Sequence, residues 1–314
     1  MYTGELELEK FLQDYKRSRV IIETTTRATL NRAVGFEHKF GKPFYQFTTD
    51  EALEMYKSIH AISVVSLQNS NLVLKHAARW FAHQYNKEVS DAYETMTKEQ
   101  LGTAIDVEKQ RSMILSREDV DNIQSNLLNA IDRAIVEMLF QGVGGESLKE
   151  LTFMDASNVD RINSRLYFRT GKITPVADTT CDMLMEAFAE DELMSFGSTS
   201  RVSKVSGNSI YKHRCNVLSD NADYNNKADI ERRYRWVQRR LILMSQDLGI
   251  KLTAGGLQAS GLLHHIKLCV KEMGLGFREF VKTEQAKELA RRYDIKSEEF
   301  FGQILAEKFG QYFE

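Results

Sequence analysis

The sequence is poor in cysteine and proline and has almost no net charge, and each shortage excludes a class of protein. Its three cysteines, Cys181, Cys215 and Cys269, are odd in number, widely spaced and form no CxxC pair, so we expect free thiols in a reducing compartment and neither disulfides nor a zinc site. The net charge of −2 excludes a polycationic packaging protein, so any nucleic-acid surface must be a local basic patch. No apolar run approaches the ~18 residues that span a membrane, and the acidic start MYTGELELEK is unlike a signal peptide. We therefore expect a cytoplasmic protein that does not enter the membrane.

The composition that is present predicts a mainly helical protein of two domains. The 314 residues exceed one average domain, and a hydrophobic content of 42% is enough for real cores. Only Pro43 and Pro175 interrupt a periodicity that is mostly helical. Residues 1–87 predict a bundle of four or five helices. The polar, weakly periodic residues 88–114 predict a linker, and residues 115–314 predict a second domain.

Residues 141–155, QGVGGESLKELTFMD, form the most informative stretch: a glycine-rich break after an apolar helix, followed by a short helical turn. Together with residues 115–121 (LSREDVD) and 252–261 (LTAGGLQASG), this stretch resembles the catalytic domain of tyrosine recombinases, the phage integrase family. That family typically reads G-L-R-x-S-E-L-x-x-L-x-W-x-D here, and residues 142–155 follow the frame without a gap. The resemblance implies a helical core-binding-like domain, which grips DNA, and a catalytic-like domain with a small antiparallel β-sheet.

The chain departs from the family pattern where the family carries its charges. Gly144 stands at the position of the first arginine, and Gly255 and Gln258 stand at those of a histidine and the second arginine. In the family these side chains stabilise the scissile phosphate while a tyrosine attacks it, and one lost donor costs on the order of 100-fold in rate. Tyr293 lies 35 residues after Gln258, a spacing the family favours, but Glu284 replaces the preceding histidine or tryptophan. We therefore expect a degenerate site without DNA cleavage, catalytic residues, metal or cofactor.

Residues 165–176, RLYFRTGKITPV, alternate around Thr170-Gly171-Lys172 and predict a β-hairpin. In the recombinases a hairpin lysine donates a proton to the leaving oxygen, and the resemblance places Lys172 or its competitor Arg169 at that position. The alternative is a turn lysine that points into water.

Residues 226–248 predict a helix with a basic face. Between Lys227 and Arg240 there are six positive and two negative side chains, a local net charge of +4 in a chain that is slightly negative. Such density is what contacts to DNA phosphates need, although arginines paired with nearby acids on a solvated face would give the same pattern. The DNA-binding candidates on this helix are Arg232, Arg233, Arg235, Arg239 and Arg240. In the N-terminal domain they are Arg27, Lys75 and Arg79, and in the hairpin Arg169 and Lys172 are further candidates.

A recombinase-like framework without its cations is expected to hold double-stranded DNA without cutting it. We therefore predict a sequence-specific transcriptional repressor, similar to the recombinase-fold master repressors that keep some SPβ-like temperate phages of Bacillus in lysogeny, located on the nucleoid of the bacterial host. An antirepressor protein or peptide is a possible further partner. One alternative is an active, divergent recombinase that uses Tyr293 with Lys172, Arg278 or Arg291 as substitute cations. Another is an accessory protein that binds a recombinase, or a second copy of itself, through the aromatic stripe of the C-terminal helix (Phe301, Ile304, Leu305 and Phe309).

Overall fold

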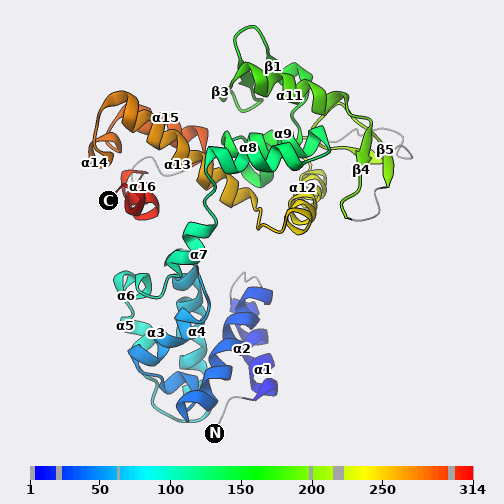
Figure 1. The fold of residues 1–314 in the computed structure, drawn as a ribbon. Coiled ribbons are helices and arrows are strands. Elements are labelled where there is room, and N and C mark those ends of the chain that lie inside the picture. Colours follow the sequence, from blue (N-terminus) through cyan, green and yellow to red (C-terminus); the bar gives the residue numbers. More distant parts are fainter. Residues whose placement is uncertain are drawn as a thin grey trace. The chain divides into compact units, whose positions relative to one another are not determined.

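The computed structural model describes residues 4–18, 23–61, 64–197, 201–214, 223–295 and 301–313. The chain divides into two compact units, Met1–Ser112 and Met113–Glu314. Helices dominate and the strands form small antiparallel sheets, which confirms the predicted fold class (Figure 1). Among the described residues, no helix has the length and apolar character to cross a membrane. Cys181 and Cys269 are free thiols, and Cys215 lies outside the described residues.

The first unit is a helical bundle around α4. Fully buried aromatic side chains, among them Phe44, Tyr56 and Phe81, form its centre. Thr48 begins α3 with a capping box, in which its side chain accepts from the Glu51 amide while the Glu51 carboxylate accepts from the Thr48 amide. The elements of this unit are α1 (Glu5–Ser18), α2 (Glu23–Phe40), η1 (Phe44–Gln46), α3 (Thr49–Lys57), α4 (Val64–Gln84), α5 (Ala92–Thr95), α6 (Lys98–Gly102) and α7 (Val107–Ser112).

The predicted linker over residues 88–114 is wrong, because most of this stretch folds onto the first unit as α5, α6 and α7. Tyr93 is fully buried and its hydroxyl donates a hydrogen bond to the Phe44 carbonyl at 3.0 Å. Leu101 and Ala104 are buried in the same core. α5 and α6 bury only one or two apolar side chains each, and no described side chain of α7 is buried, so no helical periodicity builds up in the sequence.

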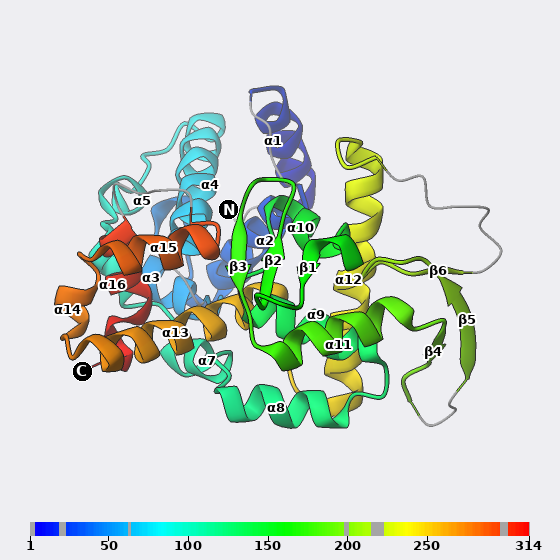
Figure 2. The same ribbon diagram turned by 90° about the horizontal axis from the view of Figure 1, so that it is seen from above.

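The second unit is built around α9, of which every residue except Arg133 is buried. This helix packs against α11 and α13 (Figure 2). The helices of this unit are α8 (Arg117–Asn126), α9 (Ala130–Phe140), η2 (Glu146–Leu148), α10 (Lys149–Thr152), η3 (Ala156–Asn158), α11 (Asp178–Ala189), α12 (Lys227–Leu248), α13 (Ala254–Met273), α14 (Phe277–Phe280), α15 (Glu284–Arg292), α16 (Phe301–Phe309) and η4 (Gly310–Tyr312).

Two small sheets lie in the second unit, and the first contains the hairpin that the sequence predicts. Strands β1 (Val159–Asp160), β2 (Arg165–Tyr167) and β3 (Ile173–Pro175) pair antiparallel in that order. The β2–β3 turn is closed by the Phe168 amide, which donates to the Lys172 carbonyl at 3.0 Å, and Gly171 adopts a φ of 82° that favours glycine. The second sheet consists of β4 (Glu192–Met194), β5 (Val202–Ser206) and β6 (His213–Arg214).

The C-terminal helix α16 buries its apolar stripe in its own unit. Phe301, Leu305 and Phe309 are almost fully buried, in one cluster with Ile266 of α13 and Phe280 of α14. In this structure the stripe therefore packs within its own unit. Self-association through α16 stays a prediction and would require the helix to leave this cluster.

Candidate nucleic-acid interface and candidate catalytic pocket

A pocket of the second unit lies between the β2–β3 hairpin, α15 and a glycine-rich loop that follows α9. Gly142 and Gly145 adopt φ values of 82° and 70°, which only glycine reaches without strain. A Cβ on Gly142 would also lie 3.0 Å from the ring of Tyr293, so the loop and the end of α15 approach more closely than another residue would allow.

The fold brings together the two positions at which the recombinases carry arginines. A Cβ on Gly144 would overlap the Nε2 atom of Gln258, which lies on α13. Gly255 lies in the first turn of the same helix, where Thr253 accepts a hydrogen bond from the Gly256 amide at 3.0 Å. The geometry of a converging pair is therefore retained, but neither position offers a cation.

Lys172 extends from the hairpin into this pocket and is not the water-exposed turn lysine of the alternative interpretation. Its ammonium lies 2.9 Å from Glu150 Oε2, 3.2 Å from Asp294 Oδ1 and 3.3 Å from the Gly142 carbonyl, and its side chain is 13% exposed. Two carboxylates therefore face one ammonium group. The hairpin lysine has the position that the resemblance implies, but its charge is more than balanced by its own protein. Arg169 does not take this position.

Tyr293 is a packed residue. Its hydroxyl donates to the Phe140 carbonyl at 2.6 Å and lies 2.9 Å from Nδ1 of His265, which is itself 2.7 Å from the Gly261 carbonyl. In the tautomer with a proton on Nδ1, this one N–H is shared between the Gly261 carbonyl and the Tyr293 hydroxyl, while the hydroxyl donates to Phe140. Burial raises the pKa of Tyr293 well above its ordinary value, so the hydroxyl stays protonated.

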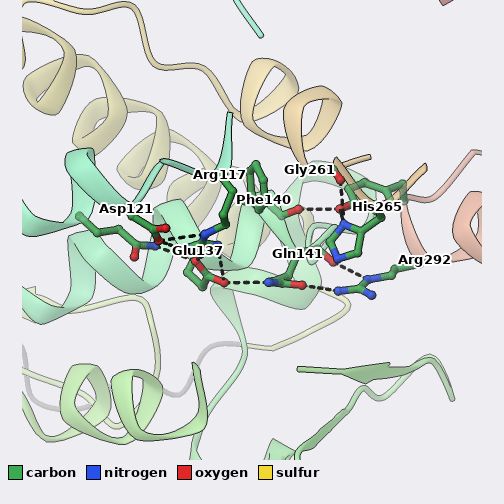
Figure 3. A network of polar contacts seen from close by, with 10 residues as sticks. Arg117, Asp121, Glu137, Phe140, Gln141, Gly261, His265 and Arg292 are labelled. Carbon is green, nitrogen blue, oxygen red and sulfur yellow. Dashed lines mark hydrogen bonds and ion pairs between the residues drawn. The ribbon is translucent and has the colours of Figure 1, made fainter. Parts of the chain in front are cut away.

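Arg292, next to Tyr293, belongs to a buried polar network (Figure 3). It donates to the carbonyl oxygen of Gln141 at 2.8 Å and to its side-chain oxygen. Gln141 in turn donates to Glu137 at 2.8 Å, and Glu137 also accepts from Arg117 at 2.8 Å and from Gln124 at 2.7 Å. The network joins α8, α9 and the end of α15. Within it, Arg117 and Arg292 donate to acceptors of the protein itself.

The pocket itself is a cavity of about 740 Å³ between the glycine-rich loop, the β2–β3 hairpin and α15. Its charged lining residues among those described are Glu146, Glu150, Glu288 and Asp294 on the acidic side and Lys172, Arg291 and Arg292 on the basic side. Arg291 also pairs with Glu284 at 3.3 Å, outside the lining. The lining has no surplus of positive charge with which to hold a phosphodiester.

Two of the five arginines predicted to contact DNA from α12 are buried, and for these the prediction is wrong. Arg233 donates to the Thr152 carbonyl at 2.5 Å, and its guanidinium lies over the ring of Phe153 at 4.2 Å. Arg240 forms a double hydrogen bond with the fully buried Asp132, one arm of which measures 2.7 Å. Both arginines stabilise the core of the second unit.

The other three, Arg232, Arg235 and Arg239, are exposed on one face of α12, and their contact with DNA stays a prediction. Arg232 pairs with Asp229 at 2.9 Å and Arg235 with Glu231 at 2.8 Å. Such exposed pairs contribute only about 0–1 kcal/mol, so a phosphate can replace the carboxylate at small cost. Arg239 forms no ion pair with any described residue.

Arg239 also lines a hollow of about 490 Å³ between α12 and the second sheet. Aromatic side chains of Phe196, Tyr211 and Trp236 line the same hollow. The basic residues of its lining are Lys212, His213, Arg239 and Arg240. None of the described residues that line it is a carboxylate, in contrast to the pocket at the glycine-rich loop.

Two cations, Lys149 and Arg169, lie against the ring of Tyr224 near the hairpin. No pattern in the sequence predicted that Lys149 or Tyr224 belongs to a site. Lys149 lies 4.1 Å and Arg169 5.2 Å from the centre of the Tyr224 ring, which contacts Phe153 at 5.2 Å. Phe153 in turn touches Arg233 of α12, so this group continues onto that helix. Lys149 and Tyr224 are the residues that were missed; Tyr224 stands in a polar loop, and no periodicity marks it.

In the first unit the three candidate cations contact carboxylates. Arg27 pairs with both Glu9 of α1 and Glu23, and so fastens α1 to α2. Two acids thus balance the charge of Arg27 in this structure, and its contact with DNA stays a prediction. Lys75 and Arg79 share the single carboxylate of Glu94, which leaves one positive charge in excess. Contact of Lys75 and Arg79 with DNA stays a prediction.

The helical second unit, its hairpin lysine and its convergent Gly144 and Gln258 define the class of a recombinase-like catalytic domain. Comparison with known proteins agrees: the family described as "MrpR, C-terminal catalytic domain" matches residues 114–309, more than half of the chain, and the chain belongs to this family.

The chain is also similar to the SPbeta prophage-derived uncharacterized protein YopR of Bacillus subtilis (strain 168). The two are 22% identical over 161 residues, which is 51% of this chain and 47% of that protein. The match thus spans about half the length of each protein.

Proposed function

We propose that this protein is a DNA-binding transcriptional repressor of phage origin, which acts by occupying its operator and does not cleave DNA. The observation that carries the proposal is the contrast between two surfaces of the second unit. The pocket at the former catalytic position is lined by four acidic and three basic side chains. The surface from the hairpin to α12, which we call the basic-aromatic surface, presents Lys149, Arg169 and Arg239 beside aromatic rings.

The basic-aromatic surface has the chemistry that a DNA backbone requires. Among the described residues, no carboxylate lies within ion-pair distance of Lys149, Arg169 or Arg239, so their charges are available to phosphates. Each phosphate that they neutralise releases condensed counterions, which provides affinity that falls with salt. Such contacts position a protein on the duplex, whereas contacts with the bases choose the operator.

The absence of cleavage is supported by charge and by geometry. Gly144, Gly255 and Gln258 supply no cation, Lys172 is balanced by two carboxylates, and the hydroxyl of Tyr293 is held by a backbone carbonyl. A phosphoryl transfer depends on positioned cations, so this arrangement favours binding over chemistry. The kinship with a prophage protein supports a role in phage regulation, for which an operator on phage DNA and an antirepressor protein or peptide are the implied partners.

The test is a gel-shift series with the full chain. We expect the triple variant Lys149→Gln, Arg169→Gln, Arg239→Gln to bind DNA at least ~10-fold more weakly and to reduce the slope of log K against log salt by about 2 to 3. Lys251→Gln, Lys271→Gln, Lys282→Gln is the matched control, since it removes three exposed charges from the same unit. A triple variant of Arg232, Arg235 and Arg239 examines the α12 face separately. Equal loss in the control would defeat the assigned surface.

Enzyme activity and gene regulation need their own measurements. A suicide DNA substrate traps any covalent tyrosine adduct, and an adduct that disappears in Tyr293→Phe would replace the repressor with a divergent recombinase. Mapping of bound DNA across a lysogen, with a reporter for each bound promoter, should show operator sites whose loss derepresses the gene. A protein that shifts no DNA even below ~100 mM salt would instead be an accessory partner of a recombinase.

A further inference from the structure

Asp294 ends α15 in a conformation that its own chemistry disfavours. The amide of Asp294 bonds to the Arg291 carbonyl at 3.2 Å, and the amide of Ile295 bonds to the Ala290 carbonyl at 2.9 Å, which is the Schellman pattern of a helix end. Asp294 therefore stands at the position where glycine is usual, with a φ of 55°. Its negative charge also faces the negative end of the helix dipole.

The Asp294 carboxylate is held by two donors of a kind that bind phosphates. Its Oδ2 atom accepts from the Gly145 amide in the glycine-rich loop at 2.9 Å. Its two oxygens lie 3.2 and 3.3 Å from the ammonium of Lys172. A backbone amide of a glycine-rich turn and a lysine are the groups with which proteins commonly bind an oxyanion. The carboxylate thus takes the position that one oxyanion would occupy.

The local charge balance shows what the carboxylate does. Lys172 is the cation of this subsite, and Glu150 and Asp294 are the two carboxylates in contact with it. These three side chains have a net charge of −1, and without Asp294 they would be neutral. The Gly145 amide would lose its acceptor at the same time.

We propose that Asp294 is an internal substitute for a phosphate group: its carboxylate occupies an oxyanion subsite formed by the Gly145 amide and Lys172, and thereby excludes phosphate from the pocket. This inference deepens the proposed function, because it adds an occupied anion subsite to the missing cations. DNA phosphates are then left to the exposed cations outside this pocket. The ligand class of the vacated subsite is a tetrahedral oxyanion or a phosphodiester.

Binding of inorganic phosphate to the full chain, measured by titration calorimetry at constant ionic strength in chloride, tests the subsite. We expect Asp294→Asn and Asp294→Gly to bind phosphate at least ~10-fold more tightly than the wild type, because a like charge within a few ångströms of the anion is removed. Asparagine and glycine are the residues that helix ends of this kind prefer, so both variants should fold. Glu288→Gln is the control: it removes from the same pocket a carboxylate that forms no ion pair with Lys172, whose described acidic partners are Glu150 and Asp294.

The tighter binding should disappear when Lys172→Gln is added to Asp294→Asn. Phosphate affinities of Asp294→Asn and Asp294→Gly that equal that of Glu288→Gln would overturn the proposal, and so would tight binding that survives Lys172→Gln. The readout uses no DNA. A wild type that shifts no DNA would therefore defeat the proposed function and leave this comparison intact.

Discussion

The hydroxyl of Tyr293 donates a hydrogen bond of 2.6 Å to the carbonyl oxygen of Phe140, the last residue of α9. This bond ties the end of α15 to the central helix of the second unit. His265, 2.9 Å from the same hydroxyl, adds α13 to the junction. The residue at the position of the recombinase nucleophile is therefore part of the core.

Loss of this hydroxyl should lower stability and leave DNA binding unchanged. Tyr293→Phe leaves the Phe140 carbonyl without its donor, and an unsatisfied buried group costs about 1–3 kcal/mol. Urea unfolding measures the change. Tyr167→Phe on β2, where the side chain is exposed and its hydroxyl forms no hydrogen bond with a described residue, should change stability by less than about 0.5 kcal/mol. An equal, small effect of both variants would contradict a structural role for Tyr293.

Stability should depend on pH through His265. Burial first, and then the nearby charge of Arg292, lower the pKa of this imidazole from 6.5 to about 4. The folded protein therefore keeps His265 neutral, and the contribution is complete above pH 6.5. Between pH 6.5 and 4 the unfolded chain binds the proton first, so this group should reduce stability by up to about 1.4 kcal/mol per pH unit.

Urea unfolding at several pH values measures that slope, and His265→Gln is the matched variant. In the variant the slope between pH 6.5 and 4 should become flatter than in the wild type. Parallel pH profiles of the two proteins would show that His265 titrates normally in the fold.

Two glycines of α13 should respond to alanine in opposite directions. A Cβ on Gly261 would overlap the Phe140 carbonyl and lie close to the Tyr293 hydroxyl, so Gly261→Ala should lower stability by about 1–3 kcal/mol or more. A Cβ on Gly255 meets nothing within 4 Å, so Gly255→Ala should raise stability by about 0.5–1 kcal/mol. Thermal unfolding of both variants decides. A destabilising Gly255→Ala would mean that the first turn of α13 is more crowded than the structure shows.

Two ion pairs of α12 should differ greatly in their contribution to stability. Arg240→Ala leaves the fully buried Asp132 without its partner, and loss of one partner of a buried pair costs about 3–5 kcal/mol. Arg235→Ala breaks an exposed pair with Glu231, which contributes at most about 1 kcal/mol. The free energy of unfolding of each variant gives the comparison. Similar losses at the two positions would refute the burial of Arg240.

Local patterns predicted several features of this fold correctly. The hairpin around Gly171 follows from alternating residues and a turn glycine, which act over a few residues. The missing cations at Gly144, Gly255 and Gln258 are facts of the sequence itself. The spacing along α12 also indicates which arginines are buried. Arg233 and Arg240 share the helical face of Val237 and Met244, which is apolar and faces the core.

The linker prediction failed for a different reason. Residues 88–114 have few apolar side chains, and only a neighbouring helix bundle makes Tyr93 and Leu101 part of a core. A short helix of low periodicity has no preference that can be read locally, since tertiary packing supplies most of its stability.

The sequence by itself determined the helical class, the recombinase-like framework and the loss of its cationic side chains, because these depend on residue identity and on spacing along the chain. Only the tertiary structure decided which charges remain available. Lys172 and Asp294 are 122 residues apart in the sequence, and Tyr293 and Phe140 are 153 residues apart; no pattern along the chain states that either pair meets. Burial then sets their roles, because a charge removed from water must find a partner within the protein, and the partner is chosen by the fold.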